Sequence, residues 1–258
     1  MSRVSGWVQC SEVIYGGNVD ANLGLTLKGY EEAVKAASSR ALELVQDGYL
    51  IGLGSGRAVA QVLNMIGEKI KKEGLKLTFV PSSYQIELLS RHLGLKLTHL
   101  EAGRLLDLAL DGADQVEVKT LNMIKGGGAA LAREKIIDSN SKKVAIVITE
   151  DKLTKNLGEG KPVPVEVLPF GVDAVIHSIE KIGGRPTLRQ GQGKVGPIIT
   201  DNGNMIVDVD FGRIEDPQTL EGEIKMIPGV VEVGLFTGLA DLVYVGRGDG
   251  TVEVLRRE

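Results

Sequence analysis

Two aspartates, a lysine and a glutamate lie within one stretch of the sequence, and these residue types could move protons on a small anionic molecule. Asp111 and Asp114 follow a short apolar run, residues 105–110, which predicts a buried strand. Open α/β sheets bind their ligands beyond the carboxyl ends of their strands. We therefore expect both carboxylates at the ligand-binding edge of a parallel sheet.

The same stretch continues with Lys125, three glycines at 126–128 and a helix-forming run from residue 129. A glycine loop that leads into a helix presents backbone N–H groups and the positive end of the helix dipole to an anion. Glu134 shares a helix face with apolar residues, and burial there would raise its pKa. Arg133 also has apolar neighbours, so helical periodicity leaves open which of the two points inward.

Composition excludes several classes of protein. The chain has 258 residues, 43% hydrophobic and 25% charged, which is typical of a folded globular protein of one large or two modest domains. A net charge of −4 argues against nucleic acid as a partner. Cys10 is the only cysteine, so neither an intrachain disulfide nor a thiolate metal site is expected. No segment resembles a membrane span or a signal peptide, and we expect a cytoplasmic protein.

Strands and helices alternate up to about residue 160. Expected strands lie at 49–53, 77–80, 105–110 and 143–149, and expected helices at 29–45, 58–73, 84–93 and from 129. This alternation predicts a parallel sheet covered by helices on both faces.

The pattern changes at residue 161 to a β-α-β-β-α-β order, that of the ferredoxin-like motif. Expected strands lie at 163–167, 187–189, 205–211 and 230–236, with helices at 172–182 and 217–226. Residues 242–255 again indicate strands that could rejoin the first sheet. We therefore expect a first domain over 28–160 plus 237–258 and a small α+β domain over 161–236. Residues 1–27 show no sustained period and are expected to be a poorly ordered or loosely packed extension.

Common cofactor and hydrolase motifs are absent. The glycines at 52–56 follow a strand and precede a helix, but their spacing does not match the dinucleotide-binding pattern. The sequence has no Walker loop and no G-x-S-x-G motif, and its three histidines lack metal-ligand spacing. The glycine loop alone fits a phosphate-binding turn and a purely structural turn equally well.

Six ordered motifs together resemble the A-type family of ribose-5-phosphate isomerases. They are GLGSG at 52–56, VPSSYQ at 80–85, DGAD at 111–114, KGGGAALAREKII at 125–137, DKL at 151–153 and PVPVEVLPF at 162–170. The resemblance extends from about residue 30 to the C-terminus. It implies a Rossmann-like α/β domain with a smaller ferredoxin-like domain, assembled as a homodimer or homotetramer.

The resemblance also implies an activity and a site. The family interconverts ribose 5-phosphate and ribulose 5-phosphate without metal or cofactor, so the expected partner is a pentose phosphate. Carried over motif by motif, Glu134 becomes the general base, with Asp111, Asp114 and Lys125 beside it. The implied substrate contacts are Ser55, Gly56, Arg57, Ala58, Asp111, Gly112, Ala113, Asp114, Lys125, Gly126, Gly127, Gly128 and Lys152.

Four positions depart from the family pattern or add to it. Arg57 and Ala58 stand where the family usually has Ser-Thr, so an arginine could replace two hydroxyls in gripping the phosphate. Gln115 stands where an acid is common, which would remove a charge near the site. Lys35 is a candidate for a lysine that the first helix often supplies.

Two other functions remain open from the sequence. A sugar-phosphate deaminase or a coenzyme A transferase would share this structural class. A sugar-phosphate sensor domain of a transcription regulator would need a basic helix-turn-helix, and the sequence shows none.

Overall fold

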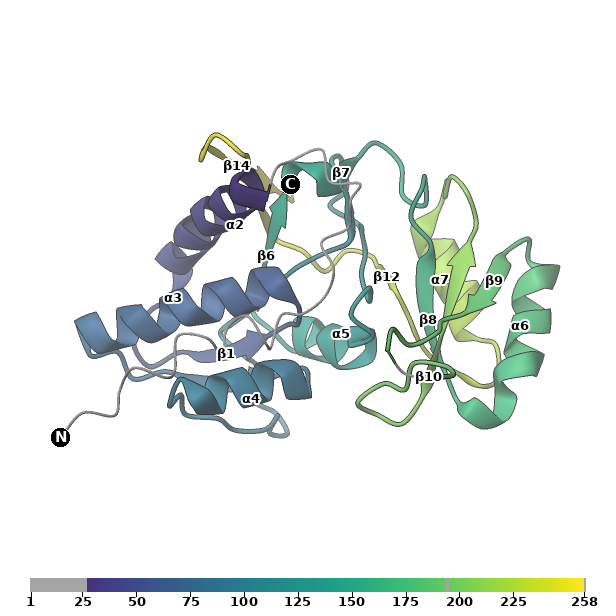
Figure 1. Cartoon of the computed structure of the whole chain (residues 1–258), viewed down its shortest axis with the longest axis horizontal. Coiled ribbons are helices and arrows are strands. Elements are labelled where there is room, and N and C mark those ends of the chain that lie inside the picture. The colour runs from purple at the N-terminus through teal and green to yellow at the C-terminus, as the bar shows by residue number, and fades with distance from the viewer. Residues whose placement is uncertain (1–26, 194, 258) are drawn as a thin grey trace.

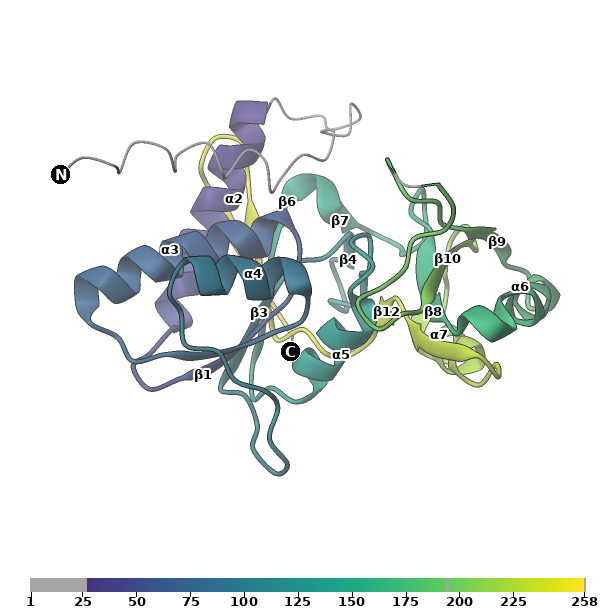
Figure 2. The ribbon, with the colours of Figure 1, turned by 60° about the horizontal axis from the view of Figure 1, so that its bottom comes forward.

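The computed structural model describes residues 27–193 and 195–257, without the side chain at 27, so the predicted extension at 1–27 lies outside the described residues, apart from the backbone of Leu27. The chain forms two bodies joined by a narrow middle region (Figure 1). One contains the helices α2 (Leu27–Ala41), α3 (Arg57–Glu73) and α4 (Tyr84–His92) and the strands beneath them, and the other contains β8 (Val163–Val167), α6 (Val172–Lys181), β9 (Arg185–Leu188) and β10 (Met205–Asp210). Figure 2 shows the same separation after a turn of 60°. Between them lie α5 and β12.

The main sheet has the order β14-β13-β6-β3-β1-β2. Five of its strands run parallel, and β14 pairs antiparallel with β13. Their bounds are β1 Leu50–Leu53, β2 Thr78–Pro81, β3 Leu108–Asp111, β6 Val144–Thr149, β13 Leu242–Gly246 and β14 Val252–Arg256. The predicted parallel sheet is confirmed, as is the return of the C-terminal strands to it.

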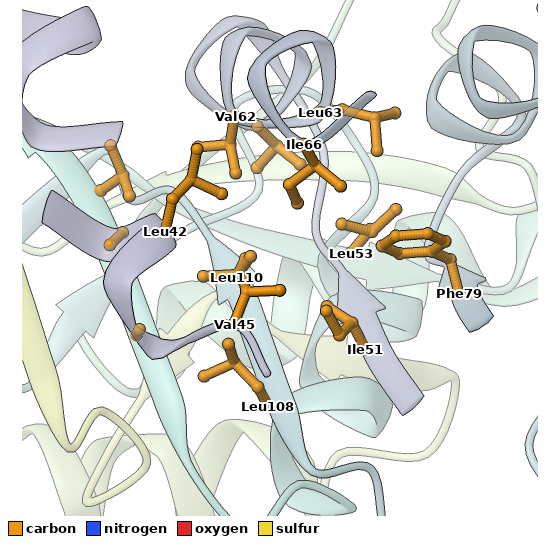
Figure 3. Packing of buried hydrophobic residues seen from close by; sticks show 14 of the residues in the cluster. Leu42, Val45, Ile51, Leu53, Val62, Leu63, Ile66, Phe79, Leu108 and Leu110 are labelled. Atoms are coloured by element: carbon orange, nitrogen blue, oxygen red, sulfur yellow. The ribbon is translucent and has the colours of Figure 1, made fainter. Parts of the chain in front are cut away.

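Helices cover both faces of this sheet, as predicted. On one face lie α2 (Leu27–Ala41), which ends in the 3-10 turn Leu42–Leu44, α3 (Arg57–Glu73) and α4 (Tyr84–His92). Alternate residues of the strands point to these helices: Ile51 and Leu53 of β1 pack against Val62, Leu63 and Ile66 of α3 (Figure 3). The opposite face packs on α5 (Leu131–Ser139) and on a small third sheet.

Local sequence fixes where these helices begin and end. Ser83 caps α4 through its hydroxyl, which accepts a hydrogen bond from the N–H of Ile86. Gly56 precedes α3 with a φ of 96°, and Gly74 ends it in the left-handed conformation with a φ of 71°. Among the described residues, no helix has the length and apolar character needed to cross a membrane.

The second sheet has the order β11-β8-β10-β9, with every neighbour antiparallel. Its elements are β8 Val163–Val167, the 3-10 turn Pro169–Gly171, α6 Val172–Lys181, β9 Arg185–Leu188, β10 Met205–Asp210, α7 Pro217–Lys225 and β11 Val230–Val233. Because β10 lies between β8 and β9, the parallel pair is split, which is the arrangement of the predicted ferredoxin-like motif.

The third sheet, β12-β5-β4-β7, was not predicted. It consists of β4 Gln115–Glu117, β5 Met123–Ile124, β7 Leu153–Thr154 and β12 Leu235–Phe236, with the 3-10 turn Glu150–Lys152 before β7. The predicted single strand over 230–236 is wrong, because the chain changes sheets at Gly234. The N–H of Gly234 donates to Pro164 O, its carbonyl accepts from Lys125 N, and a Cβ here would lie 2.5 Å from Lys125 O.

Two further boundaries differ from the prediction. The strand expected at 105–110 begins at Leu108 and includes Asp111, because Leu106 forms only an isolated bridge and Leu105 is half exposed. The helix expected from 129 begins at Leu131, because Ala129 still belongs to the glycine loop. Ala129 has a φ of 59°, and its N–H donates a hydrogen bond to Gly126 O.

Candidate active site

The predicted site residues gather at one edge of the main sheet. Strands β6, β3 and β1 are parallel neighbours, so their carboxyl ends meet there. Strand β1 continues into α3 on one face of the sheet, and β3 leads to α5 on the other. The crevice between two strands whose connections leave in opposite directions is where open α/β sheets bind ligands.

Lys125 lies at the centre of a buried charge cluster. The residue is 2% exposed, and Nζ donates a hydrogen bond to Gly112 O at 2.6 Å. The same ammonium forms ion pairs with Asp111 Oδ2 at 2.9 Å and with Glu134 Oε2 at 3.1 Å. Residues from β3, from the end of β5 and from α5 therefore converge, as the sequence predicted.

Two glycines make room for the two aspartates. A Cβ at Gly54 would lie 1.7 Å from Asp111 Oδ1, and a Cβ at Gly127 would lie 2.6 Å from Asp114 Oδ1. Gly127 also donates its N–H to Asp114 Oδ2 at 2.7 Å. The amide of Gly127 in the glycine loop thus orients Asp114.

Helix α5 turns Glu134 inward and Arg133 outward, which answers the question that helical periodicity left open. Glu134 is 5% exposed. Arg133 instead donates to Asn202 Oδ1 and to Asp201 O, both at 2.7 Å, and its guanidinium lies 5.3 Å from the ring centre of Tyr84. The arginine therefore ties α5 to residues far along the chain and leaves the interior to the glutamate.

Burial controls the protonation of the cluster. It raises the pKa of Glu134 to about 8, with repulsion from Asp111 adding to the effect of desolvation. Burial also raises the pKa of Asp111, although Lys125 opposes the shift. Desolvation by itself lowers the pKa of Lys125, but the surrounding carboxylates outweigh it and raise that pKa. Lys125 is thus a permanent cation, and Glu134 exchanges its proton near neutral pH.

Asp138 is a buried acid that sequence reasoning did not single out. It lies one helical turn beyond Glu134 and is 2% exposed. Neither of its carboxylate oxygens has a hydrogen-bond partner among the described residues. Desolvation raises its pKa well above the ordinary value, and repulsion from Asp111 adds to the shift. Burial therefore favours the protonated form of Asp138, since a lone buried carboxylate would be costly.

We expect Asp138→Asn to raise the melting temperature by a few degrees at pH 8 and to change it little at pH 4. An acid whose pKa is raised by folding stabilises the protein below its unfolded-state pKa, and that stability is lost as the pH rises toward the folded-state pKa. Asparagine removes this dependence. Thermal unfolding at the two pH values measures the difference.

Asp107→Asn is the matched control. The N–H of Leu50 and the side chain of Lys142 hold the pKa of Asp107 below its ordinary value, so this substitution has the opposite sign and destabilises the protein at pH 8. A lower melting temperature for Asp138→Asn than for the wild type at pH 8 would show that Asp138 is ionised in the folded protein.

An open pocket lies above the charge cluster, and most predicted site residues line it. They are Ser55, Gly56, Arg57, Ala58, Gly112, Ala113, Asp114, Lys125, Gly126, Gly127, Gly128, Glu134 and Lys152. Asp111, which is 1% exposed, lies behind Lys125 and is not part of the lining. Sequence reasoning missed Tyr30, Val34, Val147, Ile148 and Thr149, which also line the pocket.

The residues that α2 contributes to the pocket differ from the lysine that was expected. Lys35 is exposed and does not line the pocket, so it is not the predicted contact. Tyr30 and Val34 do so instead. Both lie in the helix expected at 29–45. Their spacing of four residues was visible in the sequence, but nothing there showed that this face reaches beyond the sheet edge.

The structure explains two of the departures from the family pattern. Arg57 lines the pocket, with its guanidinium 5.0 Å from the ring centre of Tyr30, and so offers a charge to an anion. Gln115 does not line the pocket. Its side chain accepts from Gly158 N and donates to Glu159 O, so it fixes a neighbouring loop.

Comparisons with known proteins agree with this geometry. Residues 78–250 match the family model described as ribose 5-phosphate isomerase A (phosphoriboisomerase A). The chain is 51% identical over 213 residues to ribose-5-phosphate isomerase A of Archaeoglobus fulgidus, covering 81% of this chain and 93% of the relative. It is 45% identical over 224 residues to ribose-5-phosphate isomerase A of Methanosarcina acetivorans, covering 87% of this chain and 94% of the relative.

Solved structures give the same result. The ribose 5-phosphate isomerase A of Methanocaldococcus jannaschii superposes with a TM-score of 0.83 at 43% identity, covering 88% of this chain and 99% of the other. A D-ribose-5-phosphate isomerase in complex with phospho-erythronic acid superposes with a TM-score of 0.84 at 41% identity, with the same coverage of both chains. The similarity therefore spans both bodies of the fold.

Proposed function

The chain belongs to the ribose 5-phosphate isomerase A family, and from this premise we propose that it interconverts D-ribose 5-phosphate and D-ribulose 5-phosphate through an enediolate. The observation that carries the proposal is the 3.1 Å contact between Glu134 and Lys125 at the sheet edge. This contact joins a buried base to a fixed cation, the two groups that an aldose-ketose isomerisation needs.

Glu134 is proposed as the general base. In the open-chain sugar it takes the proton from C2, which leaves an enediolate across C1 and C2, and then delivers a proton to C1. One carboxyl group serves both carbons because they are bonded to each other. A pKa of about 8 makes Glu134 a stronger base than an exposed glutamate, and a weak enough one to release the proton again.

Lys125 is proposed to stabilise the negative charge that develops on the sugar oxygens. A fixed donor in such a position typically contributes about 3 kcal/mol to the transition state. Asp111 has no surface in the pocket and touches Lys125 at 2.9 Å, so we assign it a positioning role. The carboxylate of Asp111 keeps the ammonium charged and in place.

Asp114 is proposed to move the hydroxyl protons. It lines the pocket, and the N–H of Gly127 holds its carboxylate from behind. Carrying a proton between the two oxygens of the enediolate, and to the ring oxygen when the sugar opens, requires an acid-base group of this kind.

The phosphate is proposed to bind where the pocket is cationic. Arg57 begins α3, whose dipole presents its positive end, and Lys152 approaches from the loop after β6. Ser55 adds a hydroxyl that contacts those of Ser82 and Ser83 at 2.7 Å. A homodimer or homotetramer and a cytoplasmic location belong to the same proposal, on the strength of family membership.

An assay of ribulose 5-phosphate formation across pH tests the proposal. We expect the purified protein to convert ribose 5-phosphate, with kcat/KM falling about tenfold per pH unit below pH 8, because the base is inactive when protonated. Absence of conversion at every pH would contradict the function. A pH-independent rate between pH 6 and 8 would contradict the assignment of Glu134.

A further inference from the structure

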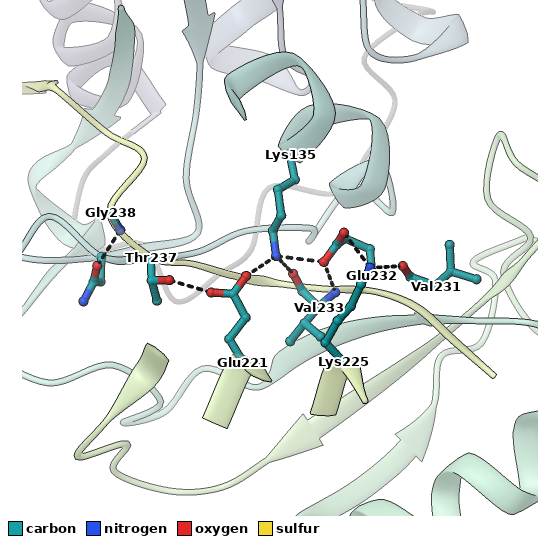
Figure 4. Close-up of polar contacts among 9 residues, drawn as sticks. Lys135, Glu221, Lys225, Val231, Glu232, Val233, Thr237 and Gly238 are labelled. Atoms are coloured by element: carbon teal, nitrogen blue, oxygen red, sulfur yellow. Dashed lines mark hydrogen bonds and ion pairs between the residues drawn. The ribbon is translucent and has the colours of Figure 1, made fainter. Parts of the chain in front are cut away.

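The residue after Glu134 is a second buried lysine, and it points away from the pocket. Lys135 is 9% exposed. Its Nζ donates to Glu221 Oε1 at 2.6 Å, to Glu232 Oε1 at 2.9 Å and to Val233 O at 2.6 Å (Figure 4). These contacts use all three donors of the ammonium group. Consecutive residues of α5 therefore serve two different charge clusters.

The partners of Lys135 come from the ferredoxin-like part of the chain. Glu221 lies on α7, and Glu232 lies on β11. The other oxygen of Glu221 accepts from Thr237, and the other oxygen of Glu232 pairs with Lys225. Burial alone would raise the pKa of Glu232, but Lys135 and the other donors hold it below the ordinary value. The carboxylate is thus ionised, and the contact with Lys135 is a true ion pair.

One aromatic ring connects this cluster to the active site. The Nζ of Lys135 lies 4.8 Å from the ring centre of Phe236, and the Nζ of Lys125 lies 5.2 Å from the same ring. Phe236 is fully buried and lies on β12, which pairs with β5 directly before Lys125. The backbone N–H of Lys125 also donates to Gly234 O. A displacement of the Lys135 side chain would therefore also move Glu134, through α5, and Lys125, through Phe236.

We propose that Lys135 is a positioning residue of the isomerisation, which ties α5 to α7 and β11 and so sets the contact between Glu134 and Lys125. The proposal rests on the proposed function. Lys135 does not line the pocket, so we expect its effect to fall on the chemical step. None of its hydrogen bonds reaches the pocket residues on the loops after β1 and β6, so we expect those residues to keep their places without it.

Lys135→Met tests this role, because methionine keeps an unbranched chain of similar length and removes the charge. We expect kcat to fall about 10- to 100-fold with KM changed less than threefold, since displacements of about 1 Å in a catalytic group cost that much. Lys135→Arg should recover part of kcat, because arginine restores a cation between Glu221 and Glu232.

Lys225→Met is the matched control. Lys225 pairs with the other oxygen of Glu232 and with Val231 O, and neither of these partners lies on α5. We expect its kcat to stay within twofold of the wild type. Both variants are assayed well below their melting temperatures, so that only folded protein is compared. A kcat for folded Lys135→Met within twofold of the wild type, or equal losses in both variants, would overturn the proposal.

A second readout separates this inference from the proposed function. The pKa of Glu134, followed by carboxyl carbon NMR, should move in Lys135→Met and stay fixed in Lys225→Met, because only the first changes the distance to Lys125. This measurement needs no substrate. An inactive wild type with a moved Glu134 titration would refute the isomerase function and support the coupling. An unmoved titration would refute the coupling.

Discussion

Replacing Glu134 with glutamine is expected to lower kcat/KM for ribose 5-phosphate by about 10³-fold or more, within the range that general base catalysis contributes. Glutamine has nearly the same shape but cannot accept the proton from C2. The substitution also removes an acid whose pKa is raised by burial, so the variant should be at least as stable as the wild type at pH 8. Steady-state kinetics and thermal unfolding measure the two effects.

Glu150→Gln is the control for this substitution. Glu150 lies after β6 near the same sheet edge, but it is exposed and does not line the pocket. Its replacement should leave kcat/KM within about twofold, since exposed charges of this kind contribute little. A folded Glu134→Gln variant with at least a tenth of wild-type activity would mean that another group takes the proton.

Lys125→Met should damage both activity and stability. We expect kcat to fall by 10²- to 10³-fold, roughly the loss seen when one donor to a developing oxyanion is removed. The variant also leaves two buried carboxyl groups without their cation, and breaking a buried pair in this way costs about 3–5 kcal/mol in the free energy of unfolding. Enzyme kinetics and urea unfolding measure these losses.

The loss of stability in Lys125→Met should grow with pH. Without the lysine, the folded-state pKa values of Asp111 and Glu134 rise further. The folded protein then binds more protons than the unfolded chain, so its stability falls as the pH increases. Urea unfolding at pH 6 and pH 8 measures this trend. Lys142→Met, which removes an exposed partner of Asp107, should cost less than about 1 kcal/mol. A Lys125→Met variant of wild-type stability at pH 8 would contradict the buried ion cluster.

The sequence predicted the convergence of the site well, because one strand-loop-helix unit carries Asp111, Asp114, Lys125 and Glu134. The end of the strand places the two aspartates at the sheet edge. The short glycine loop keeps the start of the helix, and with it Glu134, close to them. Periodicity could not choose between Arg133 and Glu134. The choice depends on Asp201 and Asn202, about seventy residues along the chain, whose position no local pattern encodes.

The errors in the predicted fold have a similar physical origin. The strand over 230–236 is continuous by composition, but Gly234 lets the chain pass between Lys125 O and Pro164 O and enter another sheet. The third sheet contains strands of only two or three residues, too short for a period to be recognised. The sequence analysis also did not single out Asp138, because a buried carboxyl group that has no hydrogen-bond partner among the described residues cannot be recognised from its neighbours in sequence.

Hydrogen exchange at C2 of the sugar tests the central claim most directly. Wild type and Glu134→Gln are incubated with ribose 5-phosphate in D₂O, and the C2 proton is followed by NMR, with binding of ribose 5-phosphate to the variant as the check that the pocket is intact. We predict that the wild type incorporates deuterium during turnover, while the variant binds the sugar phosphate and incorporates none. Loss of the C2 proton at the wild-type rate in folded Glu134→Gln would contradict the role of Glu134 as the base.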